Sequence, residues 1–140
     1  MLPYRLVLDT NVVVSAGLKP DGFQRAVLNL AITKPARLYV TTSILEEYAT
    51  VLSRPGLRIP KGLRQQTLQL IKNRSHTVAP HCRIEVTMDP RDNIFLECAD
   101  AARADYLVTG NLRHFPKFWK MTKIIGSREF LGIVAPHLLG

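Results

Sequence analysis

Three of the eleven acidic residues fall where carboxylates from separate segments can meet. Asp9 ends the apolar run 4–8, Asp92 lies at a predicted helix start, and Glu47 lies in the helix predicted after the apolar run 38–40. Carboxylate oxygens are the ligands that a hard divalent cation prefers, and a cation held in this way activates water. Asp9, Glu47 and Asp92 are therefore candidate metal ligands.

Asp9 and Asp92 each have a structural interpretation as well. Asp9 can cap a helix that begins near Asn11, whereas a carboxylate buried without a partner or a cation would be costly. Asp89 and Pro90 are typical of a helix cap and a first helical residue, which places Asp92 in the first turn. The helix dipole favours an acid there. Because both acids lie at the same expected edge of the sheet, they remain candidate ligands together.

Glu46 and Glu47 are adjacent, and the helix period separates them. Ser43 followed three residues later by Glu46 predicts a capping box, which gives Glu46 a structural role at the helix start. Glu47 is rotated about 100° from Glu46 and is free to face a cleft. The residues alone leave open that Glu47 is an ordinary solvated glutamate.

Other acids lie in the wrong places for such a site. Asp105 precedes the strand predicted at 106–109, so it lies about 13 Å from the end of that strand. Asp100 lies roughly 12 Å further along its helix than Asp92. Glu85 and Glu129 have no strand-end context, and Asp21 is typical of a turn.

The elements that must position the candidate acids alternate along the chain. Strands are predicted at 4–8, 38–40, 106–109 and 123–125, with a minor strand at 77–79. Helices are predicted at 23–30, 43–52, 63–71, 89–102 and 128–134. Short apolar strands between helices predict an α/β fold, in which a mostly parallel sheet of four to five strands is flanked by helices on both faces. The length predicts a single domain over 1–140, and in such folds the site lies beyond the carboxyl ends of the strands.

Composition excludes several classes of protein. The chain is 46% hydrophobic and 21% charged, which is typical of a globular domain, and no apolar run is long enough for a membrane span. The N-terminus lacks the pattern of a secretory signal, so a cytoplasmic protein is expected. Cys82 and Cys98 cannot form a disulfide framework. A zinc site built on His76, His81 and Cys82 would lack a paired ligand at the usual spacing.

The net charge of +8 favours a polyanionic partner such as nucleic acid. The segments 48–84 and 106–128 contain no acid. They carry the basic residues that we expect to contact phosphates: Arg54, Arg58, Arg113 and Lys117. Phe115, Phe118 and Trp119 are interleaved with the basic residues of the second segment and could stack on bases. They could equally pack a short helix onto the core.

Four blocks of the sequence resemble the PIN-domain nuclease family. They occur in the family's order and span nearly the whole chain. The blocks are Leu8-Asp9-Thr10-Asn11-Val12, Ser43-Ile44-Leu45-Glu46-Glu47-Tyr48, Asp89-Pro90-Arg91-Asp92-Asn93, and Ala104-Asp105-Tyr106-Leu107-Val108-Thr109-Gly110-Asn111. Each block alone is weakly specific, whereas four in order are strong. The most similar subgroup contains the small bacterial VapC-like toxins of toxin–antitoxin pairs.

The resemblance implies a Mg²⁺- or Mn²⁺-dependent endoribonuclease that cleaves single-stranded RNA, forms a homodimer and is neutralised by an antitoxin protein. It places Asp9, Glu47 and Asp92 on metal-binding and catalytic positions. The fourth position is commonly Asp in the family, whereas this chain has Asn111, a neutral ligand that would hold a second metal more weakly. We expect Asn11 and Thr109 to supply hydrogen bonds that fix the carboxylates.

Three alternatives to this hypothesis were considered. A PIN-fold protein that binds RNA or an antitoxin but has weakened or no catalysis is supported by Asn111. A phosphatase of the haloacid-dehalogenase kind would also have Asp9 at the end of its first strand, but it requires a second Asp where this chain has Asn11. A nucleotide-binding Rossmann fold lacks its Gly-rich turn after the first strand.

Overall fold

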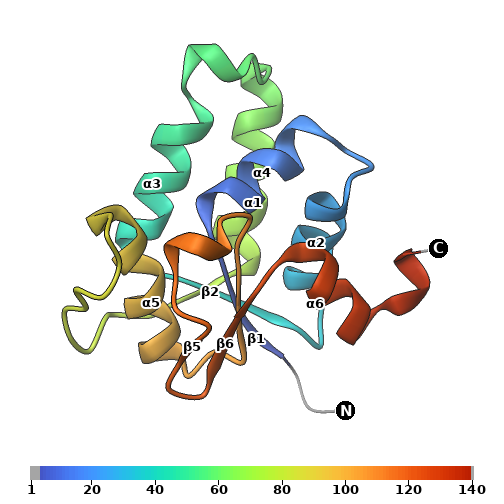
Figure 1. Ribbon diagram of the computed structural model, residues 1–140. Coiled ribbons are helices and arrows are strands. Elements are labelled where there is room, and N and C mark those ends of the chain that lie inside the picture. The colour runs from blue at the N-terminus through green and yellow to red at the C-terminus, as the bar shows by residue number, and fades with distance from the viewer. Residues whose placement is uncertain (1–3, 140) are drawn as a thin grey trace.

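A mostly parallel β-sheet forms the centre of the protein (Figure 1). The computed structural model describes residues 4–139, so residues 1–3 and 140 of the expected domain lie outside it. The strands are β1 (Arg5–Leu8), β2 (Arg37–Val40), β3 (His76–Thr77), β4 (Tyr106–Val108), β5 (Phe118–Trp119) and β6 (Thr122–Ile125). Their order across the sheet is β3-β2-β1-β4-β6-β5, and only the β5–β6 pair within residues 4–139 is antiparallel. This confirms the predicted α/β class.

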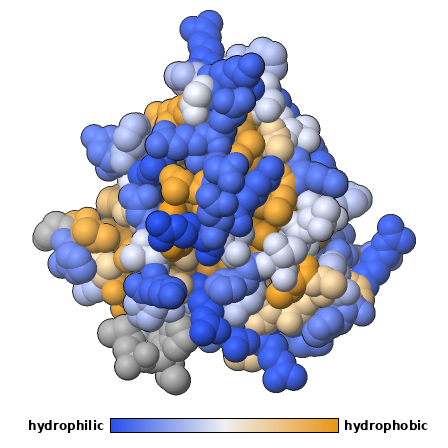
Figure 2. Space-filling model, turned by 180° about the vertical axis from the view of Figure 1, so that it is seen from behind, coloured by the Kyte–Doolittle hydropathy of each residue, from blue (hydrophilic) through white to orange (hydrophobic). Residues whose placement is uncertain are grey.

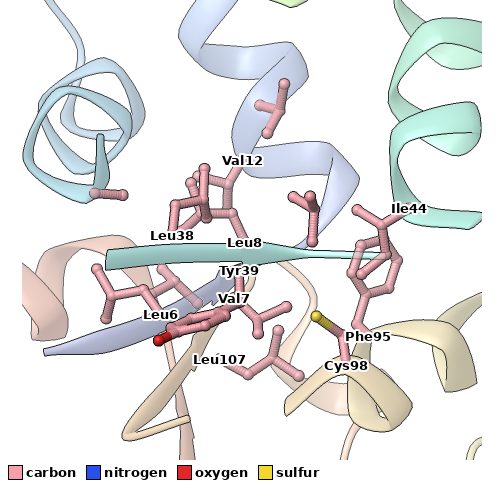
Figure 3. Close-up of a cluster of buried hydrophobic side chains, with 14 of the residues drawn as sticks. Leu6, Val7, Leu8, Val12, Leu38, Tyr39, Ile44, Phe95, Cys98 and Leu107 are labelled. Carbon is pink, nitrogen blue, oxygen red and sulfur yellow. The ribbon is translucent and has the colours of Figure 1, made fainter. Parts of the chain in front are cut away.

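Helices follow most of the parallel strands and cover both faces of the sheet. They are α1 (Thr10–Leu18), α2 (Phe23–Ala31), α3 (Thr42–Leu52), α4 (Lys61–Arg74), α5 (Pro90–Ala102) and α6 (Ser127–Val134). Helix α5 contacts β1, β2 and β4. In Figure 3, α1 and α3 lie on the other side of these strands. Because β1 is covered on both faces, its residues from Leu6 to Leu8 are all fully buried.

The core fixes the place where β1 ends. Val12 of α1 and Ile44 of α3 reach the strands from one side and Cys98 of α5 from the other (Figure 3). The buried Tyr48 hydroxyl of α3 donates a hydrogen bond to the Leu8 carbonyl at the last residue of β1. The backbone that leads into Asp9 is therefore held from several directions.

The sheet has six strands within residues 4–139 rather than the four to five predicted. The minor strand predicted at 77–79 is β3, which contains only two residues. The strand that was not predicted is β5, whose two residues are too few to show an alternating pattern. The short helix considered for Phe118 and Trp119 is wrong, because both residues form β5. Phe115 does pack into the core and is 8% exposed.

The N-terminal caps of α5 and α3 can be compared with the predicted ones. Asp89 caps α5, as predicted, and its Oδ1 accepts a hydrogen bond from the Arg91 backbone N–H. The capping box predicted at Ser43 is wrong. The cap of α3 is Thr41, whose Oγ1 accepts from the Ile44 N–H, because the chain turns into the helix directly after β2 ends at Val40.

The surface is largely polar. Figure 2 shows the side that faces away in Figure 1, where hydrophilic residues dominate and hydrophobic ones lie in patches between them. In the described part of the chain, no helix combines the length and apolar character needed to cross a membrane.

Candidate active site

Asp9 begins the site at the carboxyl end of the central strand β1. Its backbone N–H donates to the Val108 carbonyl at 3.0 Å, which ties the ends of β1 and β4 together. Its Oδ1 accepts from the Thr10 N–H at 2.7 Å, so Asp9 does cap α1. The side chain is nevertheless part of a cleft wall, although Asp9 is only 5% exposed. Capping and a role in the cleft are therefore compatible.

Thr109, at the end of β4, fixes the second oxygen of Asp9. The fully buried Thr109 hydroxyl donates to Asp9 Oδ2 at 2.7 Å and accepts from the Asn111 backbone N–H at 3.0 Å. Asn11 does not bind a carboxylate, contrary to expectation. Its Oδ1 accepts from the Gly110 N–H at 2.9 Å, because the loop after β4 passes over the first turn of α1. Asn11 thus orients the loop that carries Asn111.

Asp92 enters the same cleft from the first turn of α5. Its side chain is 16% exposed. Within residues 4–139, Asp92 Oδ2 is buried and accepts no hydrogen bond of good geometry, although His114 Nδ1 lies 3.3 Å from it. A buried carboxylate oxygen without a hydrogen-bond donor is unfavourable, and a ligand that supplies positive charge would relieve it.

The cleft has a volume of about 280 Å³ and brings together side chains from four parts of the chain. Helices α3 and α5, which contribute Glu47 and Asp92, lie on the same side of Figure 1. The predicted site residues that line the cleft are Asp9, Asn11, Glu47, Arg54, Asp92 and Asn111. Arg113 lines a neighbouring cavity instead. Arg58 and Lys117 are exposed and line neither.

The electrostatics of the cleft oppose ionisation of its two central acids. Burial raises the pKa of Asp9 above its usual value, the charge of Asp92 raises it further, and the Thr109 hydrogen bond acts against this. Burial also raises the pKa of Asp92, and the charge of Asp89 adds to that effect. Both carboxylates would gain from a nearby cation.

The donor set fits a hard divalent cation. Carboxylate oxygens of Asp9 and Asp92 and the amide oxygen of Asn111 are available at the cleft, with Glu47 on its wall. Among the described residues, no three His, Cys, Asp or Glu side chains form a ready-made metal cluster. Mg²⁺ does not require one, because it usually keeps several waters and binds proteins through one or two carboxylates.

Four polar residues that line the cleft were not among the predicted site residues: Thr10, Asp89, Arg91 and His114. His114 lies in the 3₁₀ turn Leu112–His114 after β4 and contacts Asp92. Arg91 also lines the cleft and pairs with Asp89 at 2.9 Å. The one signal for His114 was its place three residues after Asn111, just beyond a strand end.

Residues 5–113 match the family model of the PIN domain, and this span contains all four residues of the predicted metal site. The chain belongs to the PIN-domain family. PIN domains are typically nucleases, which is consistent with the acidic cleft at the strand ends.

Two known proteins resemble this PIN domain over most of its length. Uncharacterized protein MJ1680 of Methanocaldococcus jannaschii is 29% identical over 128 residues, which cover 86% of this chain and 82% of that protein. A chain in the crystal structure of VapBC2 from Rickettsia felis, bound to a DNA fragment from their promoter, superposes with a TM-score of 0.56. That match covers 86% of this chain and 98% of the other at 16% identity, so it shows a shared fold.

Proposed function

We propose that this PIN domain is a divalent-cation-dependent endoribonuclease that cleaves single-stranded RNA. The observation that carries the proposal is the convergence of Asp9 and Asp92 on one cleft, where Asp92 Oδ2 is buried without a good donor among residues 4–139. Asp9 and Asp92 would hold Mg²⁺ or Mn²⁺, with Glu47 and Asn111 completing the site. Such a cation supplies water activation and neutralises charge on the phosphoryl oxygens.

The chain's own residues would prepare the site for this ligand. Thr109 holds Asp9 in one rotamer through its hydroxyl, so little rearrangement is needed on binding. Asn11 holds the loop that presents Asn111. Arg54 lies on the cleft wall, where its guanidinium can pair with an RNA phosphate.

The test is cleavage of a fluorescently labelled single-stranded RNA with and without Mg²⁺. We expect wild-type protein to cleave only with the cation, and Asp9→Asn to be inactive while its circular dichroism matches that of the wild type. Undiminished cleavage by Asp9→Asn would refute the assignment. RNA binding without turnover by the wild type would favour the alternative of a PIN-fold binding protein, which Asn111 supports.

Asn111 can be tested directly. Asn111→Asp adds the carboxylate that the family commonly has at this position. We expect the variant to reach half-maximal cleavage at a lower Mg²⁺ concentration, because another negative charge strengthens cation binding. An unchanged or higher Mg²⁺ requirement would show that Asn111 does not face the bound ion.

We further propose that the protein is the toxin of a toxin–antitoxin pair, acts as a homodimer and is neutralised by an antitoxin. The support is the shared fold with a chain of the VapBC2 structure. Induced expression should slow bacterial growth, and Asp9→Asn should not. Light scattering of the purified protein tests the dimer, for which a monomer at micromolar concentration is the contrary result.

A further inference from the structure

A second cavity lies beside the active-site cleft. Its volume is about 540 Å³, and Asn111 and His114 line both spaces, so they form the ridge between them. It is built where β4 and β6 end and α6 begins. In Figure 1 the start of α6 and the loop after β4 lie close together near the centre of the view.

The beginning of α6 offers backbone donors to this cavity. The first N–H groups of a helix have no partner within the helix, and the helix dipole gives them a positive potential. The cap residue of α6 is Gly126, which has no side chain to accept from them. Gly126, Ser127 and Arg128 all line the cavity. Helix starts of this kind bind phosphate groups.

Ser127 provides an independent sign of a ligand. It is 7% exposed, and its hydroxyl is buried without a hydrogen-bond partner among residues 4–139. A buried hydroxyl left without a partner is unfavourable. Because Ser127 lines the cavity in the first turn of α6, rotation about its Cα–Cβ bond would let the hydroxyl donate to an oxygen bound at the helix start.

The charge around the cavity also favours an anion. Arg113 and Arg128 line it, and Arg128 is oriented by the Phe23 ring, whose centre lies 5.5 Å from the guanidinium carbon. Of the acids in the described chain, Glu129 alone lines the cavity, and it pairs with Lys123 at 3.4 Å. Its charge is thereby partly offset.

We propose that this second cavity binds a phosphate of the RNA strand adjacent to the one held in the active-site cleft. The α6 N–H groups and the Ser127 hydroxyl bind the phosphate oxygens, and Arg113 and Arg128 contribute positive charge. The strand crosses the ridge of Asn111 and His114 between the two spaces. The identity of the anion as RNA rests on the proposed function, whereas the affinity of the cavity for a phosphodiester does not depend on cleavage.

The test measures binding of a labelled 12-nucleotide oligouridylate by fluorescence anisotropy in EDTA, so that cleavage plays no part. Ser127→Asp places a carboxylate at the helix start, where the helix dipole favours it, and it should repel the phosphate. We expect at least a tenfold weaker affinity. Gln66→Glu, on an exposed position of α4, is the control for the same change in net charge and should stay within twofold of the wild type.

A second variant keeps the test valid if Ser127→Asp folds poorly. Arg113 is exposed, so Arg113→Gln should leave the fold intact. A plot of the logarithm of the RNA association constant against the logarithm of salt concentration falls with a negative slope. Arg113→Gln should make this slope less steep by about 0.7, the value for one phosphate contact on a single strand. Lys34→Gln, at an exposed position in the loop before β2, removes the same charge and should not change the slope.

The outcomes separate the two proposals. Weaker binding by Ser127→Asp and a reduced slope for Arg113→Gln support the phosphate site, even if the wild type fails to cleave RNA with Mg²⁺. Unchanged affinity of a folded Ser127→Asp, an unchanged slope for Arg113→Gln, or no RNA binding by the wild type overturns the site. The Asp9→Asn cleavage test is unaffected by the first two of these results.

Discussion

Two of the acidic side chains of helix α5, Asp92 and Asp100, lie in opposite electrostatic environments. Asp100 Oδ1 accepts from Lys120 Nζ at 2.7 Å and from Trp119 Nε1 at 3.1 Å, and Cys82 Sγ lies 3.8 Å from its Oδ2. The Lys120 hydrogen bond holds the pKa of Asp100 below its usual value. Asp92 has a buried Oδ2 without a good donor in the described chain, and burial raises its pKa.

The difference separates a structural acid from one available to a ligand. Asp100 joins α5 to the β5–β6 hairpin, and its charge is satisfied within the chain. Asp92 lies eight residues earlier on the same helix and lines the cleft. Its Oδ2 has His114 Nδ1 at 3.3 Å but accepts no hydrogen bond of good geometry from residues 4–139. Helical position alone does not distinguish these roles; the groups that pack against each turn do.

The largest expected effect is the loss of RNA cleavage when the charge of Asp92, but not that of Asp100, is removed. Asp92→Asn should reduce Mg²⁺-dependent RNA cleavage about a hundred- to a thousandfold, because loss of a cation ligand removes several kcal/mol of transition-state stabilisation. Asp100→Asn should cleave within about threefold of the wild-type rate. Both rates can be measured under single-turnover conditions. Equal losses of activity in the two variants would contradict the distinction.

A smaller effect is expected when the support of Asp9 is removed. Thr109→Val keeps the shape of this buried side chain but loses the hydroxyl that donates to Asp9 and accepts from Asn111. We expect cleavage to fall about 10- to 100-fold and the Mg²⁺ requirement to rise. Thr109→Ser retains the hydroxyl and should recover most of the activity. If Ser behaves like Val, the role of Thr109 is in packing.

Asp100→Ala tests whether Asp100 stabilises the fold. It leaves the partly buried Trp119 N–H without its acceptor, so the free energy of unfolding should fall by about 1–3 kcal/mol. Because the pKa of Asp100 is lowered in the folded state, its contribution is present above its ordinary value of 3.8 and is lost as the pH falls through the folded value. Urea unfolding should therefore show a constant gap between wild type and variant from pH 7 to about pH 5 and a narrowing gap below pH 4.

That pH dependence has a clear contrary result. A gap that stays constant down to pH 3 would show that the Asp100 carboxylate contributes by its shape alone. A gap that widens on acidification would contradict the sign of the shift. Asp100→Asn, which keeps an acceptor for Trp119 but no charge, separates the hydrogen bond from the ion pair with Lys120.

The smallest effect concerns the two thiols near Asp100. Cys98 of α5 is fully buried, and burial raises its pKa to about 12, whereas Cys82 is exposed. Because the thiolate is the reactive form, native protein should react with one equivalent of Ellman's reagent and urea-unfolded protein with two. Two rapid equivalents in the native state would show that the α5 packing opens readily. Cys82→Ser should then remove the fast reaction.

Local sequence rules predicted much of the fold because they act over a few residues. The apolar run before Asp9 and the Asp89-Pro90 pair located β1 and the start of α5, since strand burial and helix capping depend on near neighbours. The acids at strand ends followed from the parallel sheet. The two-residue strand β5 carried no such local signal and forms through its pairing with β6. The minor strand predicted at 77–79 is β3, which pairs with β2 at His76 and Thr77.

Local rules also failed where several residues could serve one role. Thr41, Thr42 and Ser43 are all suitable caps, and the end of β2 selected Thr41. Glu47 lines the cleft as expected, although the capping box used to separate it from Glu46 does not exist. The burial of Ile44, Tyr48 and Leu52, rather than the cap, decides which side of α3 faces the core.

By itself, the sequence determined that acids would stand at the carboxyl ends of buried parallel strands, because chain direction and apolar pattern are local properties. Only the tertiary structure decided which polar groups meet there. His114 reaches Asp92, Asn11 binds the loop after β4, and Asp100 is neutralised by a hairpin twenty residues further along the chain. Such partners are distant in sequence. The Asn11 contact arises when β1 and β4 pair and bring the loops at their ends together, whereas the Asp100 contact requires the β5–β6 hairpin.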